Sequence, residues 1–311
     1  VEPDFYDIHF KATQVLNESN KLLLSFYNGQ DELKRNVSRT ENFNKWGNLI
    51  GSVMWNRVIG SRSFVNTSAN MSRYKALSAV KYTFYEDDED EDRGEDDFET
   101  RSVSTLTATE QYNIKSQAEL FLSYKAKLNL GTQLAHTIIR PSDVKIAGDI
   151  EEDEDNFVRL SPLPFDELSA YGEAELKFGR LFIRPGLHFS VYQFRKERFY
   201  SFQPRFFASY NISTHHQVYT SYNRMTQYLH LVTNPLLGIN TDIWLPSTGK
   251  LKPEESESYN LGYSYRTEGW KTSLEGYWRE LNHATNYAEG GSQLVDSKNW
   301  EQSATTGRGT A

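Results

Sequence analysis

The chain has 311 residues, no cysteine, a net charge of −8 at pH 7 and 14% aromatic residues. It contains no run of 18 apolar residues, which excludes a membrane-spanning helix, and the lack of cysteine excludes a disulfide scaffold, a thiolate metal site and a cysteine nucleophile. The charge is unevenly distributed, because residues 86–99 contribute −10 and residues 149–155 contribute −6. The remainder therefore carries +8, and the acidity is confined to two short runs.

Alternating apolar and polar residues predict β-strands along nearly the whole chain. Within residues 167–177, for example, Glu173, Glu175 and Lys177 alternate with Ala174 and Leu176. Successive side chains of a strand point to opposite faces, so such a strand is charged on one face and apolar on the other. About twelve strands are expected, at residues 5–14, 20–28, 45–57, 62–73, 102–122, 127–140, 167–177, 180–194, 202–211, 216–228, 256–267 and 270–283.

The predicted connections alternate between short turns and longer segments. The short ones are rich in Gly, Asn and Ser, which supply the backbone freedom that tight turns need. The long ones are expected at residues 29–44, 74–101, 141–166, 195–201, 229–255 and 284–300. In outer-membrane barrels the short connections face the periplasm and the long ones face outward, so both acidic runs should project from the outer rim.

These features predict an all-β fold, an antiparallel transmembrane β-barrel with a polar lumen and a lipid-facing exterior. The 19 Tyr and 18 Phe suit the aromatic girdles of such a barrel. A soluble sheet protein is the alternative, but it would not usually sort its connections by length or repeatedly place Glu, Lys and Arg on its inward face. A β-propeller would show a repeat of roughly 40 residues, and none is found.

Residues 219–263 carry a strand ending, a loop element and a returning strand with distinctive residues. In order, these residues are Arg224, Gln227 and His230, then Asp242, Trp244 and Pro246, then Lys252, Pro253 and Glu254. The block resembles the barrel of TonB-dependent outer-membrane transporters, especially the Bacteroides-type receptors. The opening Phe5-Tyr6-Asp7, the pair Pro204-Arg205 and the terminal residues 307–311 also fit that family's pattern.

The resemblance implies a 22-stranded barrel around a plug, in the outer membrane of a Gram-negative bacterium. We expect residues 1–311 to be a partial segment of such a barrel, because strand-like sequence reaches both ends. We recognise no plug domain, no TonB box and no C-terminal closing strands in residues 1–311. The strand at residues 5–14 is therefore not expected to pair with residues 270–283 or 301–311, and the sheet should be open or completed by other polypeptide.

The function that the resemblance implies is TonB-dependent active uptake of a scarce nutrient, with this segment supplying wall, lumen lining and extracellular loops. The implied partners are outer-membrane lipid and lipopolysaccharide, TonB acting through the plug, and a surface lipoprotein; no nucleic acid is expected. A non-transporting scaffold in an outer-membrane complex and an outer-membrane enzyme stay open as alternatives. No catalytic motif is present, so enzyme activity is not expected. A glycan, a peptide, a siderophore and cobalamin are all compatible nutrients.

The candidate ligand-binding residues lie in the same block. Asn223 and Gln227 share a strand face that we interpret as lumenal, and with His230, Asp242 and Trp244 they could line the outer vestibule. Amide and indole groups suit sugar or peptide ligands. The alternative is structural, with these residues anchoring the loop or packing against the plug.

The first acidic run is a candidate cation site, because oxygen-rich clusters suit Ca²⁺. Its candidate ligands are Asp87, Asp88, Asp90, Asp92, Asp96 and Asp97. The run lacks the spacing of an EF-hand, and the alternative is a solvated loop that keeps the outer surface hydrophilic. Apart from this Ca²⁺, no cofactor is expected.

Overall fold

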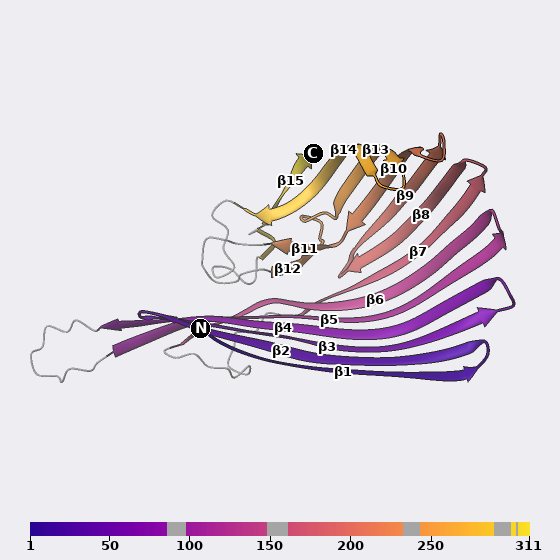
Figure 1. Cartoon of the computed structure of the whole chain (residues 1–311). Coiled ribbons are helices and arrows are strands. Elements are labelled where there is room, and N and C mark those ends of the chain that lie inside the picture. Colours follow the sequence, from indigo (N-terminus) through magenta and orange to yellow (C-terminus); the bar gives the residue numbers. More distant parts are fainter. Residues whose placement is uncertain (86–97, 148–160, 233–242, 289–299, 303) are drawn as a thin grey trace, which may run out of the picture.

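The computed structural model describes residues 1–85, 98–147, 161–232, 243–288, 300–302 and 304–311. Thirteen strands form one antiparallel sheet in which neighbours follow the chain order, and β11 and β12 form a separate two-stranded sheet (Figure 1). Within these ranges no helix has both the length and the apolar character needed to cross a membrane. The strands are β1 Glu2–Asn17, β2 Asn20–Val37, β3 Thr40–Ile59, β4 Ser63–Tyr85, β5 Phe98–Ser123, β6 Ala126–Ala147, β7 Leu163–Phe178, β8 Leu181–Phe194, β9 Glu197–Asn211, β10 His216–Gln227, β11 Leu229–Val232, β12 Ile243–Pro246, β13 Glu254–Arg266, β14 Lys271–Tyr287 and β15 Ala304–Thr310, with a 3-10 turn at Trp300–Gln302.

All twelve predicted strands are present, but several are much longer than predicted. Two of the predicted long connections are wrong. Residues 29–44 are not a loop, because β2 and β3 pair from Asn20↔Arg57 up to Val37↔Thr40 and leave a two-residue turn. The connection at residues 195–201 is likewise only a two-residue turn between β8 and β9. In both places polar residues outnumber apolar ones, so the alternation on which the prediction relied is lost while the strand continues.

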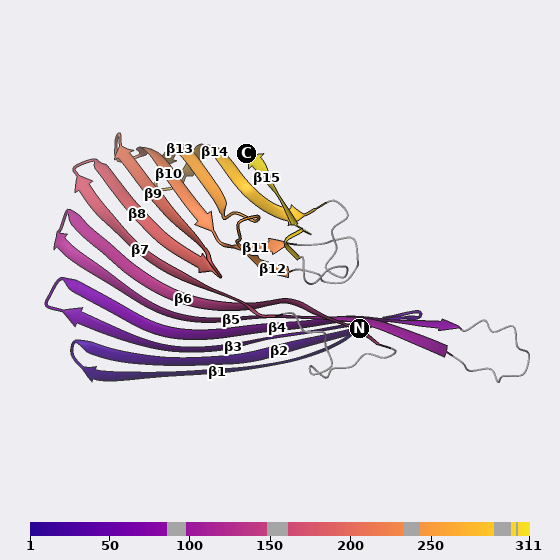
Figure 2. The same ribbon diagram turned by 180° about the vertical axis from the view of Figure 1, so that it is seen from behind.

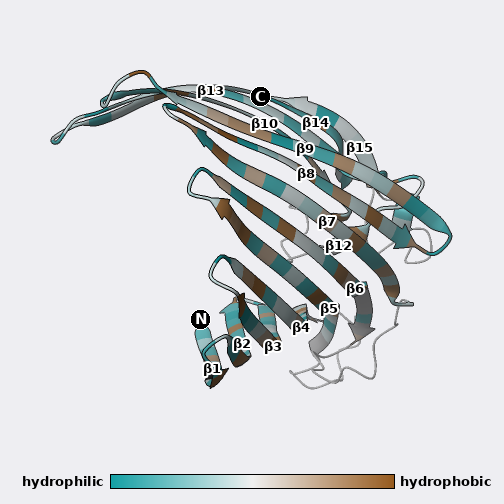
Figure 3. Ribbon diagram, turned by 90° about the vertical axis from the view of Figure 1, so that its right-hand side faces the viewer, coloured by the Kyte–Doolittle hydropathy of each residue, from teal (hydrophilic) through white to brown (hydrophobic). Residues whose placement is uncertain are grey.

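Hydrophilic and hydrophobic residues alternate along many of the strands (Figure 3), and the register assigns them to opposite faces, as predicted. Hydrogen-bonded registers place one residue from each of β1 to β7 in a single row that contains no charged or polar group. These residues are Ala12, Leu24, Val53, Ala69, Ile114, Leu134 and Leu168. We call this row the apolar row. It lies on the convex face of the curved sheet.

The concave face is polar. Ser52 donates to Asn70 at 2.6 Å and Asn70 donates to Asn113 at 2.8 Å, which forms a ladder across three strands. Farther along, Lys127 lies 3.0 Å from Glu175, so the predicted lumenal charge at Glu175 is paired. A polar concave face and an apolar convex face are the arrangement of a water-facing lumen and a lipid-facing wall.

Tyrosines and glycines pair across strands on this concave face. The ring of Tyr171 lies over Gly131, directly opposite on the neighbouring strand, and leaves no room for a Cβ atom there. Gln117 donates to the Tyr171 hydroxyl at 2.7 Å and fixes the ring in this position. Gly131 therefore gives the lumenal ring space to lie flat against the wall.

The sheet is open in the described part of the chain. β1 pairs only with β2, and β15 pairs only with β14. The two edge strands lie far apart on the curved sheet, so no ladder joins them (Figure 1). The expectation of an unclosed barrel wall is thus confirmed.

The connections sort onto two rims. The connections after β1, β3, β5, β7, β9 and β13 are all turns of two to four residues at one rim. The opposite rim carries the two tight turns after β2 and β8 together with the four long connections (Figures 1 and 2). Both acidic runs belong to long connections of this second rim, which we call the outer rim.

Replacing Ala174 with Lys should destabilise the full-length barrel in lipid vesicles by about 2–4 kcal/mol, because the ammonium group would face hydrocarbon near the midplane. Asn129→Lys is the matched control, since it adds the same charge on the concave face between Glu173 and Glu175. Urea-induced unfolding in vesicles measures both changes. Equal destabilisation by the two variants would contradict the assignment of the faces.

Epitope tags test the two rims in the full-length parent protein. Tags inserted within residues 86–97 and 149–155 should be detected by antibody on intact cells, whereas tags at Gly179 and Gly269 should be detected only after the outer membrane is permeabilised. Detection at Gly269 but not within residues 86–97 on intact cells would invert the topology.

Candidate functional site

A hairpin from the outer rim folds onto the concave face. β10 pairs with β9 only as far as Asn223↔Arg205, although it continues beside β13 to Gln227↔Glu254. The chain then leaves the wall, and β11 and β12 pair from Leu229↔Pro246 to Val232↔Ile243. Seen from both sides, this β11–β12 hairpin lies within the curve of the sheet (Figures 1 and 2).

Where β10 separates from β9, side chains replace the missing ladder. The Ser201 hydroxyl of β9 lies 2.6 Å from the Thr226 hydroxyl of β10, and the Thr226 backbone N–H donates to the side-chain oxygen of Gln203 at 3.3 Å. Gln203 in turn donates to the Ser190 hydroxyl at 3.2 Å. These bonds matter because a buried backbone group without a partner costs about as much as a lost hydrogen bond.

Two stacked tyrosines hold the hairpin against the wall. The rings of Tyr192 and Tyr228 lie 4.6 Å apart and are inclined by only 9°. The Tyr228 hydroxyl is 2.7 Å from the Ser190 hydroxyl, and the Tyr192 hydroxyl donates to the backbone oxygen of Ser247 at 3.1 Å. Both rings belong to a buried cluster that also contains Ile139, Leu163, Phe165 and Phe194. Aromatic pairs contribute about 0.5–1.5 kcal/mol beyond their burial, so this pair is a principal anchor.

The return arm of the hairpin is fixed by a second set of contacts. His230 is 1% exposed, and its Nε2 atom lies 2.8 Å from the Ser247 hydroxyl. The Gly249 backbone N–H donates to a carboxylate oxygen of Glu197, at the outer end of β9. Leu251 packs with Val232 and Leu245 in a separate buried cluster. The hairpin is therefore anchored along its whole described length.

The predicted ligand residues do not form one cluster. Asn223 lies in the barrel wall, whereas Gln227 donates to the Leu229 backbone oxygen at the start of the hairpin. His230 is buried among the hairpin contacts. Trp244 lies on β12, half-buried against the aromatic cluster. Asp242 lies outside the described residues, as do all six aspartates proposed to bind Ca²⁺.

Residues essential to this arrangement were not identified from the sequence. Tyr192, Ser190 and Gln203 lie on strands distant in the sequence, and only the folded sheet brings them beneath Tyr228. The polar residues Ser190 and Gln203 at lumenal positions look like ordinary lumen lining. Among the described residues, no group of three or more His, Asp or Glu side chains could hold a metal ion.

A cavity of about 470 Å³ separates the hairpin from the opposite part of the wall. Its lining residues are Tyr74, Ala76 and Ser78 of β4, Thr105, Thr107 and Thr109 of β5, and Leu229, Leu231 and Trp244 of the hairpin. None of them is charged. Apolar walls with a few convergent polar groups are typical of ligand sites, and this cavity combines indole and leucine side chains with a row of threonine hydroxyls.

A second cavity, of about 490 Å³, lies lower on the concave face and differs in chemistry. Charged side chains from β5, β6, β7 and β9 line it, among them Lys115, Lys127, Glu173 and Arg205. Glu173 lies 3.8 Å from Arg184, so these charges are partly compensated. The concave face thus holds an uncharged cavity at the hairpin and a charged one farther from it.

The docking of the hairpin should weaken in acid. Burial lowers the pKa of His230 to about 4, whereas an exposed imidazole has a pKa of about 6.5. The neutral ring is therefore favoured in the docked hairpin, and this contribution is complete above pH about 6.5 and is lost as the pH falls toward 4. The Nδ1 atom of His230 lies 3.7 Å from the Glu254 carboxylate, which would offset part of the loss.

Limited proteolysis of the hairpin in the full-length protein measures this effect. Cleavage within residues 228–251 should increase between pH 7.5 and pH 5 in the wild type more than in His230→Gln, which cannot take up the proton. Comparing the two proteins at each pH removes the protease's own pH dependence. An unchanged ratio of their cleavage rates across this range would show that His230 does not control docking.

The comparisons with known proteins agree with this architecture. The family described as TonB dependent receptor-like, beta-barrel matches residues 9–307, and no curated protein matches significantly. The solved structure of FpvA from Pseudomonas aeruginosa bound to a pyoverdine–iron complex has a TM-score of 0.59 and 11% identity, over 99% of this chain and 45% of that chain. The FrpB iron transporter from Neisseria meningitidis has a TM-score of 0.58 and 14% identity, over 94% and 46%. The RagAB peptide importer has a TM-score of 0.58 and 9% identity, over 90% and 40%.

At such low identities the similar structures show the fold alone, and this chain spans less than half the length of each of them. Their names describe receptors and transporters rather than enzymes. The family match covers nearly the whole chain. The chain therefore belongs to the TonB-dependent receptor family and forms part of a transmembrane β-barrel in the outer membrane of a Gram-negative bacterium.

Proposed function

We propose that the chain supplies wall, lumen lining and extracellular loops to a TonB-dependent importer of a scarce nutrient. This proposal rests on the cavity between the β11–β12 hairpin and the concave face, in a chain whose family match extends from residue 9 to residue 307. TonB would act through a plug outside this chain, and a surface lipoprotein would cover the outer rim. No catalytic role is proposed.

The first step of uptake in this proposal is capture at the hairpin. Trp244, Leu229 and Leu231 offer an apolar surface, and Thr105, Thr107 and Thr109 offer hydroxyl groups that both donate and accept. Their lack of charge favours an uncharged part of a nutrient at this level. The hairpin contacts are side-chain contacts rather than a continuous ladder, so release toward the charged lumen requires no break in the wall.

Uptake is tested in cells that carry or lack the full-length parent gene. Labelled representatives of four classes, an oligosaccharide, a peptide, a ferric siderophore and cobalamin, are supplied at limiting concentration. Accumulation of one class should require both the gene and the proton gradient, and a protonophore should abolish it. If no class depends on the gene, while the protein is present in the outer membrane, the scaffold alternative is favoured instead.

Trp244→Ala should reduce accumulation of the identified nutrient about tenfold, because one aromatic wall of the cavity is removed; a lost contact of about 1.4 kcal/mol corresponds to a tenfold change in binding. Tyr124→Ala is the matched control, since Tyr124 is 86% exposed at a short turn on the opposite rim. Both variants should show the wild-type amount of folded barrel on gels. Equal uptake by the two variants would exclude Trp244 from the ligand site.

A further inference from the structure

The outer part of β9 has a paired strand on one side only. Its ladder with β8 is unbroken along the whole strand. The ladder with β10 ends at Asn223↔Arg205, and the next residue of β9 is Pro204, which has no N–H group to donate. Within the described part of the chain, residues 198–203 therefore pair with β8 alone.

Alternate residues of β9 direct their backbone groups toward β8 and away from it. The Asn211 N–H donates to the Arg180 backbone oxygen at the start of β8 at 2.9 Å, which assigns the odd-numbered residues to the β8 side. The backbone groups of Arg198, Tyr200 and Phe202 consequently point toward the gap left by β10, where no backbone group of the described residues pairs with them. Each carries one N–H and one C=O group. We call these three residues the β9 edge, which is about 13 Å long at 3.3 Å per residue.

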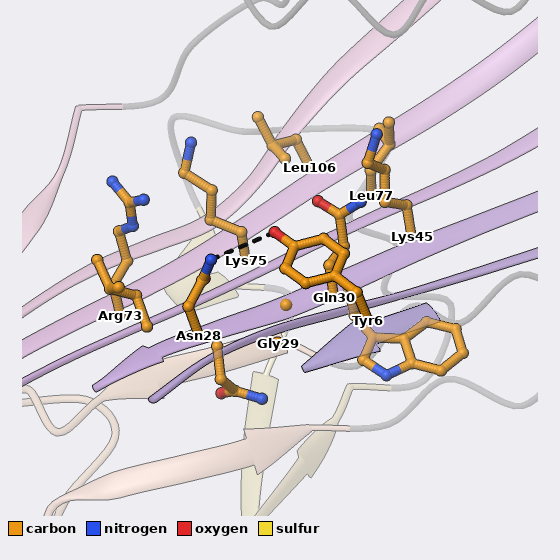
Figure 4. A pocket seen from close by; sticks show the side chains of 13 residues that line it. Tyr6, Asn28, Gly29, Gln30, Lys45, Arg73, Lys75, Leu77 and Leu106 are labelled. Carbon is orange, nitrogen blue, oxygen red and sulfur yellow. Dashed lines mark hydrogen bonds between the residues drawn. The ribbon is translucent and has the colours of Figure 1, made fainter. Parts of the chain in front are cut away.

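The two ends of the sheet also have free edges, but these are of a different kind. β1 and β15 are the terminal strands of the sheet, so a further barrel strand can pair with each of them. At the β1 end the side chains are bonded to the neighbour that is present, since the Asn28 amide of β2 donates to the Tyr6 hydroxyl at 3.3 Å (Figure 4). The β9 edge lies between two strands of the same wall, so a further strand of the barrel does not reach it.

The β9 edge is closed toward the lumen and open on the convex face. Ser201 and Gln203, which point to the concave face, are only 6% and 3% exposed and are hydrogen-bonded to Thr226. The register aligns Tyr200 with the apolar row, and the side chains of Tyr200 and Phe202 are 61% and 62% exposed. An occupant of the edge therefore reaches it from outside the barrel.

A cationic crest stands at the outer end of the β9 edge. The Gly249 N–H donates to the Glu197 carboxylate, which brings the turn at residues 248–252 beside the β8–β9 turn and engages the acid of the crest. Within the described ranges no carboxylate forms an ion pair with the cations of these two turns, which with Glu197 carry a net charge of +4. The exposed cations of the crest are Arg195, Lys196, Arg198, Lys250 and Lys252.

We infer that the β9 edge is a strand-addition site for an acidic, extended segment of a second protein at the cell surface. An extended polypeptide presents N–H and C=O groups at the spacing of the edge, which is why a free strand edge is a template for another strand. Main-chain hydrogen bonds hold the segment along Tyr200 and Phe202. Its carboxylates meet the crest, where Arg and Lys donate charge-assisted hydrogen bonds.

The geometry favours a partner protein over a peptide nutrient. A nutrient passes through the lumen, whereas the contacts of Ser201 and Gln203 with Thr226 separate the edge from the concave face. The docking therefore does not depend on import, and a barrel that imports nothing can still carry this site.

Hydrogen exchange resolved to single amides, in the purified full-length parent protein, tests whether the edge is free. The amides of Tyr200 and Phe202 should exchange at least tenfold faster than those of Ser201 and Gln203, which face β8. Equal protection of all four amides would mean that the parent chain itself pairs with the edge, and would overturn the inference.

Photo-crosslinking of the full-length protein in its native host tests the occupant. A photoreactive phenylalanine analogue replaces Phe202, and the matched control replaces Phe206, four residues along the same face, where the ladder with β10 is intact at Phe206↔Tyr222. Position 202 should give at least fivefold more adduct than position 206. Mass spectrometry should map the adduct to a segment of another protein that is rich in Asp and Glu.

Two variants separate strand addition from chance proximity. Tyr200→Pro removes an N–H of the edge and leaves the β8 ladder intact, as Pro204 already does, and should reduce the adduct at position 202 at least fivefold. Arg195→Gln/Lys196→Gln/Lys250→Gln should reduce the adduct at least threefold. The control variant removes the same charge near the short turns of the opposite rim and should leave the adduct within twofold of the wild type; it is Lys21→Gln/Lys125→Gln/Lys271→Gln.

Three results would overturn the inference. They are an adduct that Tyr200→Pro leaves unchanged, an adduct only with lipid or with this chain itself, and a mapped segment without acidic residues. Heat-modified gel mobility establishes that each variant is folded. Where Tyr200→Pro does not fold, the charge variant of the crest decides, and an unchanged adduct in it counts against the site.

Discussion

Every backbone N–H and C=O group inside a bilayer needs a partner within the protein, and the rest of this structure depends on that constraint. The long antiparallel registers satisfy it, as in the pairing of β4 with β5 from Ser63↔Leu120 to Tyr85↔Phe98. Because the backbone groups are used in the ladder, the chemical character of each face is set by its alternating side chains. The convex face then meets lipid through the apolar row, while the concave face can carry a hydrogen-bonded ladder such as Ser52–Asn70–Asn113.

The hairpin illustrates what happens where the constraint is relaxed. β10 stops pairing with β9 at Asn223, near the outer rim, and the chain is free to turn inward. The interactions that replace the ladder come from side chains, with the Tyr192–Tyr228 stack and the Ser190 hydroxyl at their centre. This arrangement creates a cavity without opening the wall. The shape of the cavity at the hairpin therefore depends on a small number of side-chain contacts.

The convex face is layered by depth in the membrane. Apolar side chains occupy one level, and nearer the outer rim the same strands carry Arg73, Lys75 and Lys45, which lie four, six and eight residues from the apolar row. Farther toward the outer rim polar residues predominate on both strand faces, apart from the buried Phe43, so period-two patterning disappears although the pairing of β2 with β3 continues to Val37↔Thr40. This loss of alternation makes residues 29–44 look like a loop in the sequence.

The fold class, the two faces and most of the strands could be predicted from the sequence, because a period of two is a local pattern that does not depend on which strands are neighbours. Leu168 and Glu175, for example, could be assigned to opposite faces of their strand from their spacing alone. It also identified the block around Trp244 through its resemblance to the family. The length of each strand, the burial of His230 and the stacking of Tyr192 on Tyr228 became apparent only in the folded chain. These features arise from register and curvature, which bring together residues dozens of positions apart, and no local pattern in the sequence records which strands will meet.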